Sequence, residues 1–177
     1  MEEKVSLWKS NLNNGMIMGL LGVIYSLVMY FLDLSISKVP EYFFFAAQIV
    51  ILFYMIKSYR DSHLYGFITY GQSLGVGVII FLYYSIITAV FTYILYKFID
   101  TSLIAKLLAL TEETLGKRGL TQEQMGAAMM IQKKIMIPEI LPVLGIIVSM
   151  FFGTIMSLIV SIFTRNEGNP LIDVPKN

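Results

Sequence analysis

Long apolar runs separated by short charged clusters dominate the pattern of hydrophobic and polar positions along this chain. The longest run, 64–96, holds 33 consecutive residues without Asp, Glu, Lys or Arg. A helix rises about 1.5 Å per residue, so about 20 apolar residues cross a hydrocarbon core of roughly 30 Å. The run therefore predicts a transmembrane helix, which we place at 71–97.

Three more apolar segments predict three further spans, at 15–34, 40–56 and 138–164. The second is the shortest, because only 15 residues from Tyr42 to Ile56 are free of charge. Glu41 and Lys57 flank it and can snorkel toward the headgroups, so we retain it as a span. Pro138 and Pro142 stand in the first turns of the fourth span, where a missing N–H is tolerated.

The segment between the third and fourth spans has a different pattern. Its leucines and isoleucines recur at helical spacing with charged residues between them, which is typical of an amphipathic helix. A break at 116–119 is followed by Thr121 and Gln124, the spacing of a capping box. We predict an extramembrane helical hairpin over 101–137.

These elements define an all-α integral membrane protein with four transmembrane helices. We divide it into a juxtamembrane segment (1–14), three spans (15–100), the hairpin (101–137), the fourth span (138–164) and a flexible polar tail (165–177). Both termini are then on one side of the membrane. Lys and Arg are nearly balanced across it, but the rule that places them in the cytoplasm weakens in long connections such as the hairpin. We therefore expect cytoplasmic termini.

Composition narrows the function classes. Hydrophobic residues make up 56% of the chain and charged residues 14%, with a net charge of +1, so we expect no nucleic-acid partner. Cysteine is absent and His63 is the single histidine, which leaves no thiolate or paired-histidine metal site. We find no catalytic constellation, and predict a protein that is not an enzyme and carries no metal or cofactor.

Small residues recur at helical spacing in three of the predicted spans. Such stripes allow helix backbones to approach closely in lipid. Two interpretations are open: the stripes bind a partner protein or a lipid, or they pack the spans of this chain against one another. The candidate interface residues are Gly15, Gly19, Gly22, Gly71, Gly75, Gly145, Ser149, Gly153 and Ser157.

Polar side chains within the spans are the second candidate site. Gln48 lies midway along the second span and Gln72 near the start of the third, which also carries the hydroxyls of Tyr83 and Thr88. Polar residues at membrane depth often mark a binding site or pathway. The alternative is that they form ordinary hydrogen bonds between or within helices.

Several short motifs together resemble a known family. They are Trp8-Lys9, Tyr59-Arg60-Asp61, the segment from Gly66 through Ile68 to Tyr70-Gly71-Gln72, Phe98-Ile99-Asp100, Arg118-Gly119-Leu120-Thr121 and Lys133-Lys134. This combination resembles a family of small uncharacterised bacterial membrane proteins, a domain of unknown function with four predicted transmembrane helices. The resemblance implies a multi-pass protein of the bacterial inner membrane. Its genes often neighbour one for a polyprenyl-phosphate type glycosyltransferase, which implies a role in the cell envelope.

Two functions follow as hypotheses. The first is a non-enzymatic accessory or scaffold subunit that binds a membrane protein partner, with that glycosyltransferase as one candidate, or forms a homo-oligomer. The second is a small membrane protein that binds or moves a lipid or small polar solute through Gln48, Gln72, Tyr83 and Thr88. In either case membrane lipids surround the spans.

Overall fold

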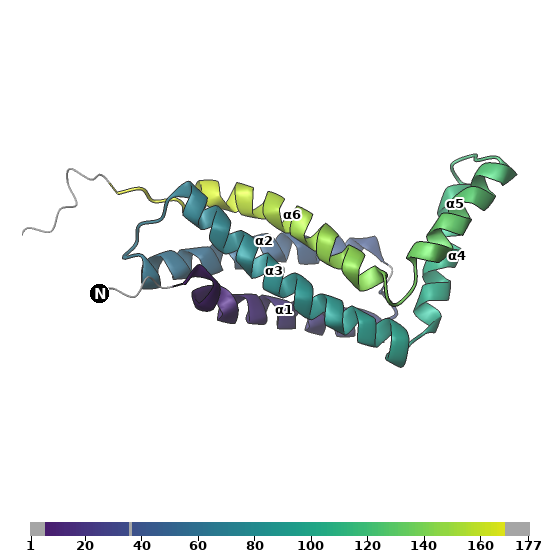
Figure 1. Cartoon of the computed structure of the whole chain (residues 1–177), viewed down its shortest axis with the longest axis horizontal. Coiled ribbons are helices and arrows are strands. Elements are labelled where there is room, and N and C mark those ends of the chain that lie inside the picture. The colour runs from purple at the N-terminus through teal and green to yellow at the C-terminus, as the bar shows by residue number, and fades with distance from the viewer. Residues whose placement is uncertain (1–5, 36, 169–177) are drawn as a thin grey trace, which may run out of the picture.

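A computed structural model describes residues 6–35 and 37–168. Four long helices run side by side, and a pair of shorter helices stands at a steep angle to them at one end (Figure 1). The bundle consists of α1 (Leu7–Phe31), α2 (Lys38–His63), α3 (Tyr70–Ile94) and α6 (Leu141–Thr164). The hairpin consists of α4 (Ser102–Gly116) and α5 (Gln122–Ile135). The predicted all-α class, with four helices long and apolar enough to cross a membrane, is confirmed.

The outward faces of the bundle are apolar. Large hydrophobic side chains such as Phe43, Phe151 and Phe163 are 75%, 63% and 70% exposed. A water-soluble monomer rarely exposes large contiguous apolar patches, whereas lipid-facing helices must. The chain is a multi-pass membrane protein.

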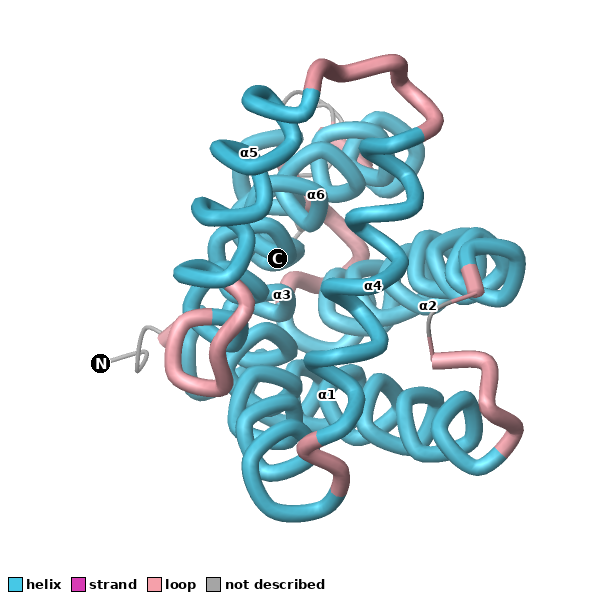
Figure 2. The backbone as a smooth tube through the Cα atoms, turned by 90° about the vertical axis from the view of Figure 1, so that its right-hand side faces the viewer, coloured by secondary structure: helices cyan, strands magenta, loops and turns pink. Residues whose placement is uncertain are grey.

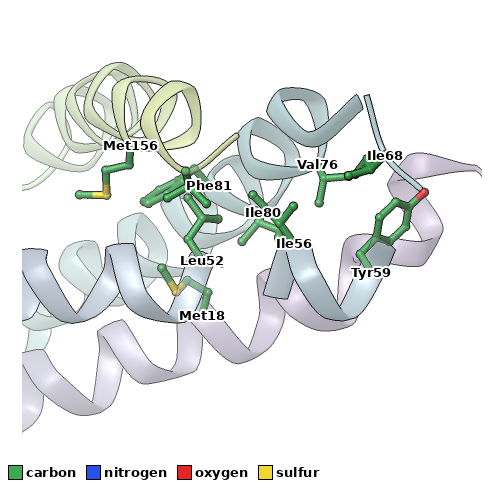
Figure 3. Close-up of a cluster of buried hydrophobic side chains, with 10 residues drawn as sticks. Met18, Leu52, Ile56, Tyr59, Ile68, Val76, Ile80, Phe81 and Met156 are labelled. Atoms are coloured by element: carbon green, nitrogen blue, oxygen red, sulfur yellow. The ribbon is translucent and has the colours of Figure 1, made fainter. Parts of the chain in front are cut away.

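Helix α3 is the centre of the bundle, with α1 packed along one side and α6 along the other. The buried core follows its axis from Met156 and Phe81 to Ile68 and Tyr59 (Figure 3). The core therefore lies in the half of the bundle farther from the hairpin. This leaves the half nearer the hairpin less tightly filled.

Helix α2 is attached along only part of its length. Its buried residues, Gln48, Leu52, Ile56 and Tyr59, recur every three or four positions and define one inward face. One turn before Gln48 that face opens, since Phe45 is 37% exposed. From Gln48 onward the helix packs against the core, and toward its N-terminus it diverges from α6. There it stays in contact with α1 through the stacked rings of Phe44 and Tyr25, whose centroids lie 4.0 Å apart.

Two helices extend beyond the apolar segments from which their spans were predicted. The first begins at Leu7, inside the expected juxtamembrane segment, of which 1–5 lie outside the described residues. The second continues to His63 rather than Ile56. Charged residues mark where a helix leaves the hydrocarbon, but they do not end it, since Lys and Arg are good helix formers.

A set of polar contacts joins the ends of α2, α3 and α6 opposite the hairpin. The Ser73 and Thr164 hydroxyls lie 2.6 Å apart in a fully buried position, and the Arg60 guanidinium donates to the Thr164 carbonyl oxygen at 3.2 Å. Ile68 and Asn166 pair through two backbone hydrogen bonds of 3.0 and 2.9 Å. This pairing holds 165–168 in place, where we expected a flexible tail; the rest of that tail, 169–177, lies outside the described residues.

The hairpin crosses the opposite end of the bundle and extends past it on one side (Figure 2). A π-helical turn, η1 (Leu95–Ile99), ends α3 with the Asp100 N–H bonded to the Leu95 carbonyl oxygen at 2.8 Å. Asp100 then accepts hydrogen bonds from the Ser102 hydroxyl and N–H, which lower the pKa of its carboxyl. These bonds start α4, since such caps satisfy free N–H groups at a helix N-terminus.

Two ion pairs lie where the hairpin meets the bundle. Lys106 Nζ of α4 lies 3.7 Å from Asp33 Oδ1, just beyond α1. Lys97 Nζ donates to Glu139 Oε1 at 2.5 Å, between η1 and the segment that leads into α6. This hydrogen bond lowers the pKa of the Glu139 carboxyl. The pair is exposed to solvent, so it orients the hairpin more than it stabilises the fold.

Candidate functional site

The four residues predicted to form a polar site are not brought together. Gln72 lies at the exposed N-terminus of α3, where it completes a capping box with Thr69. Its Oε1 accepts from the Thr69 N–H at 3.0 Å, and its own N–H donates to the Thr69 hydroxyl. Both hydrogen bonds join residues only three positions apart, so the Gln72 side chain caps the N-terminus of α3.

Tyr83 and Thr88 belong to the contact between α1 and α3. The Tyr83 hydroxyl donates to the Trp8 carbonyl oxygen at 3.4 Å, and its ring lies against Gly15. The Thr88 hydroxyl donates to the carbonyl oxygen of Tyr84 in its own helix at 2.9 Å. Both hydroxyls thus donate their protons within the chain.

Gln48 is different, because it lies at the point where α2 separates from the bundle. It is 6% exposed, and it faces a groove of about 500 Å³ between α2 and α6. Phe81 and Tyr84 of α3 contribute from the third helix. The other lining residues are Glu41, Tyr42 and Phe45 of α2 and Val148, Ser149, Phe152 and Met156 of α6.

The groove is apolar and aromatic inside and opens toward the surroundings of the bundle. The Phe45 and Phe152 rings meet edge to face, with centroids 6.1 Å apart. Val148 and Phe152 are 52% and 45% exposed, so the α6 wall is partly on the lipid-facing surface. The volume of the groove, about 500 Å³, lies within the range of roughly 300–1,000 Å³ that is usual for small-molecule sites.

The Gln48 amide has an unmet hydrogen-bonding requirement. Among the described residues its buried Nε2 forms no hydrogen bond of good geometry, although the Tyr84 hydroxyl of α3 lies beside the Gln48 side chain. A buried donor left unsatisfied costs about 1–3 kcal/mol, and neither lipid chains nor the surrounding apolar side chains can replace the missing acceptor. An acceptor-bearing ligand in the groove would remove this cost.

Glu41 places a carboxylate at the hairpin end of the groove. It also borders a second cavity of about 420 Å³, which reaches toward Ser26 of α1, Thr92 of α3 and Leu107 of α4. The residues lining the α2–α6 groove include no Lys, Arg or His within the described chain. Negative charge is therefore the only formal charge that the groove presents.

Most of the predicted small-residue interface is used within the chain. A Cβ on Gly15 would lie 2.8 Å from Tyr83 Cδ2, one on Gly19 2.6 Å from Ile87 Cδ1 and one on Gly22 2.7 Å from Tyr84 Cε2. These distances are too short for any side chain, so α1 approaches α3 through its glycines. On α1 the small residues therefore pack two spans of this chain against each other, which was the second interpretation of the stripes.

The stripe on α6 divides into a packed half and an open half. Gly153 lies against Phe81, and Ser157 is fully buried against Gly77 of α3. Ser149 borders the groove. A Cβ on Gly145 would meet nothing within 4 Å, and the same holds for Gly71 and Gly75 of α3. On their Cβ side, those three glycines therefore face no other helix among the described residues.

Sequence reasoning selected Gln48 but missed its neighbours. Glu41 was assigned only to the end of a span, and Tyr84 and Phe45 were not singled out. The signal was the spacing of Gln48 from Leu52 and Ile56, which puts the amide on the buried face of α2. Within the described ranges no three His, Cys, Asp or Glu residues lie close enough together to hold a metal ion.

Residues 13–166 match the family described as Protein of unknown function (DUF4199), and the chain belongs to that family. No curated protein and no solved structure matches the chain.

Proposed function

We propose that this family member is a non-enzymatic membrane protein that binds a lipid in the groove between α2 and α6. The observation that supports the proposal is the buried Gln48 Nε2, which forms no hydrogen bond within the described part of the chain and faces an apolar groove. The glycerol esters of a membrane lipid carry carbonyl oxygens that only accept hydrogen bonds. An ester bound at Gln48 supplies the missing acceptor while its acyl chain fills the aromatic part of the groove.

Lipid retention by the purified full chain tests the proposal. We expect native mass spectrometry after mild-detergent extraction to detect one bound lipid on the wild type. Gln48→Leu keeps the volume but removes the donor, and one hydrogen bond of about 1 kcal/mol corresponds to roughly fivefold weaker binding. The matched control is Thr154→Val on α6, because that hydroxyl donates to Met150 within its own helix and does not line the groove.

A second readout separates a binding role for Gln48 from a structural one. In the delipidated protein Gln48→Leu removes an unsatisfied buried donor, so its thermal unfolding midpoint rises. Added lipid should raise the midpoint of the wild type more than that of the variant. A wild type that retains no lipid, or a variant that retains as much as the wild type, contradicts the proposal.

An accessory subunit is the second candidate function. It is favoured by the hairpin, which extends past the bundle (Figure 2) and exposes Met130 and Ile131 at 63% and 57%. Its partner would be a membrane protein of the cell envelope, such as a polyprenyl-phosphate glycosyltransferase, or a second copy of this chain. Affinity purification at native expression level tests it: a stoichiometric partner lost when the hairpin is altered supports this function.

We place the protein in the bacterial inner membrane with its termini in the cytoplasm. Since the chain has no cysteine, a single Lys117→Cys variant in the hairpin turn reports the side directly. Labelling of whole cells by a membrane-impermeant maleimide supports this orientation, and labelling only after lysis reverses it.

A further inference from the structure

The groove presents polar groups at two depths. Glu41 and Gln48 both line it and stand seven residues apart on α2. Seven residues make about two turns and about 10 Å of rise, so the two side chains share one face of the helix. A carboxylate thus stands at the mouth of the groove and an amide about 10 Å deeper.

A glycerophospholipid has its polar groups in the same order. Its headgroup lies at the membrane surface and its ester carbonyls lie at the edge of the hydrocarbon. The hydrocarbon is about 30 Å thick and the whole bilayer about 40–45 Å, which gives each headgroup layer roughly 5–8 Å. The rise of about 10 Å between Glu41 and Gln48 exceeds this layer by a few Å, so the ester carbonyls of a lipid bound at both residues lie slightly deeper than in the free bilayer.

Resting on the proposed function, we propose that the groove selects an amine-bearing glycerophospholipid, with the headgroup ammonium at Glu41 and an ester carbonyl at Gln48. The negative charge of Glu41 determines which lipid headgroup the groove prefers. Since Glu41 is the one charged residue among the described residues lining the groove, an ammonium is attracted there and an anionic headgroup is repelled. Tyr42, beside Glu41 at the mouth, adds an exposed aromatic face that also favours a cation.

A transmembrane helix of a partner protein fits the groove less well. A helix about 10 Å across and about 30 Å long occupies more than roughly 2,000 Å³, against about 500 Å³ for the groove. Such a helix would cover the mouth without reaching the buried Gln48 amide. Its backbone carbonyls are also bonded within the helix and supply no free acceptor.

The test compares headgroups on identical acyl chains. Phosphatidylethanolamine and phosphatidylglycerol are added in turn to the delipidated full chain, and the bound fraction is measured by native mass spectrometry. Because an exposed ion pair contributes about 0.2–1 kcal/mol, we expect a preference for phosphatidylethanolamine of about 1.4- to fivefold. Glu41→Gln should bind the two lipids alike, whereas the control Glu123→Gln, on α5, keeps the preference.

The outcomes separate this inference from the function on which it rests. Equal binding of both lipids by the wild type, or a preference that survives Glu41→Gln, overturns the headgroup assignment and leaves lipid binding intact. Failure of the wild type to bind either lipid overturns both. A second protein copy or a partner helix that excludes both lipids from the groove also overturns both.

Discussion

Gly153 of α6 lies directly against the ring of Phe81 on α3. A Cβ on Gly153 would lie 2.6 Å from Phe81 Cδ1, and Phe81 is itself 2% exposed in the core. The same ring lines the α2–α6 groove. The absence of a side chain at one position thus fixes both the helix contact and one wall of the candidate lipid site.

Gly153→Ala should therefore destabilise the bundle. The added methyl meets the first atoms of a buried ring that cannot swing aside, and overpacking of this kind costs about 1–3 kcal/mol. The measurement is the thermal unfolding midpoint in a fixed detergent. Gly145→Ala is the matched control on the same helix face, because its Cβ meets nothing within 4 Å, and alanine there gains helix propensity. Equal midpoints for the two variants would argue against the close contact.

The two glutamines show how far the sequence predicts this molecule. Each is an uncharged amide in an apolar segment, and hydropathy alone gives no reason to separate them. Gln72 is satisfied three residues away by Thr69, so its capping box was recognisable in the sequence, as the one at Thr121 was. Gln48 is defined by where α2 leaves its neighbours, a tertiary relationship that no local pattern encodes.

The spans and the hairpin were more predictable, since the length of an apolar run and the spacing of charges decide them locally. The role of each glycine stripe was not predictable. Gly19 and Gly75 stand at equivalent spacings, yet one faces Ile87 across a helix contact and the other meets nothing. Small residues permit close packing, and the partner is determined by the rest of the bundle.

A second prediction separates the two glutamines experimentally. Thr69→Ala removes the capping hydroxyl at the start of α3, at a typical cost of about 1 kcal/mol. We expect faster amide hydrogen exchange over the first turn of α3 and unchanged lipid retention. Gln72→Ala should behave in the same way with a smaller effect, because it loses only the reciprocal bond to the Thr69 N–H. If Gln72→Ala retained less lipid than the wild type, Gln72 would be part of the lipid-binding site after all.

The ion pair at the base of the hairpin gives a prediction for pH. Since Lys97 donates a hydrogen bond to it, the Glu139 carboxyl has a pKa below its ordinary value of about 4.3. A carboxyl whose pKa is lowered by folding contributes stability that is complete above its unfolded pKa and is lost as the pH falls through the folded pKa. The difference in unfolding midpoint between the wild type and Glu139→Gln should thus be constant near neutral pH and vanish in the acidic range below about pH 4.

The comparison needs a carboxyl that lacks this partner. Glu112→Gln on α4 is suitable, because among the described residues Glu112 takes part in no ion pair. The unfolding midpoint of Glu112→Gln should differ little from that of the wild type at every pH. Lys97→Met should strongly reduce the pH-dependent difference at Glu139, since the main donor that lowers the pKa is then gone and only the Glu139 backbone N–H still does so. A difference at Glu139 that persists unchanged at acidic pH, or one that Lys97→Met leaves undiminished, would show that the hairpin is not held to the bundle by this pair.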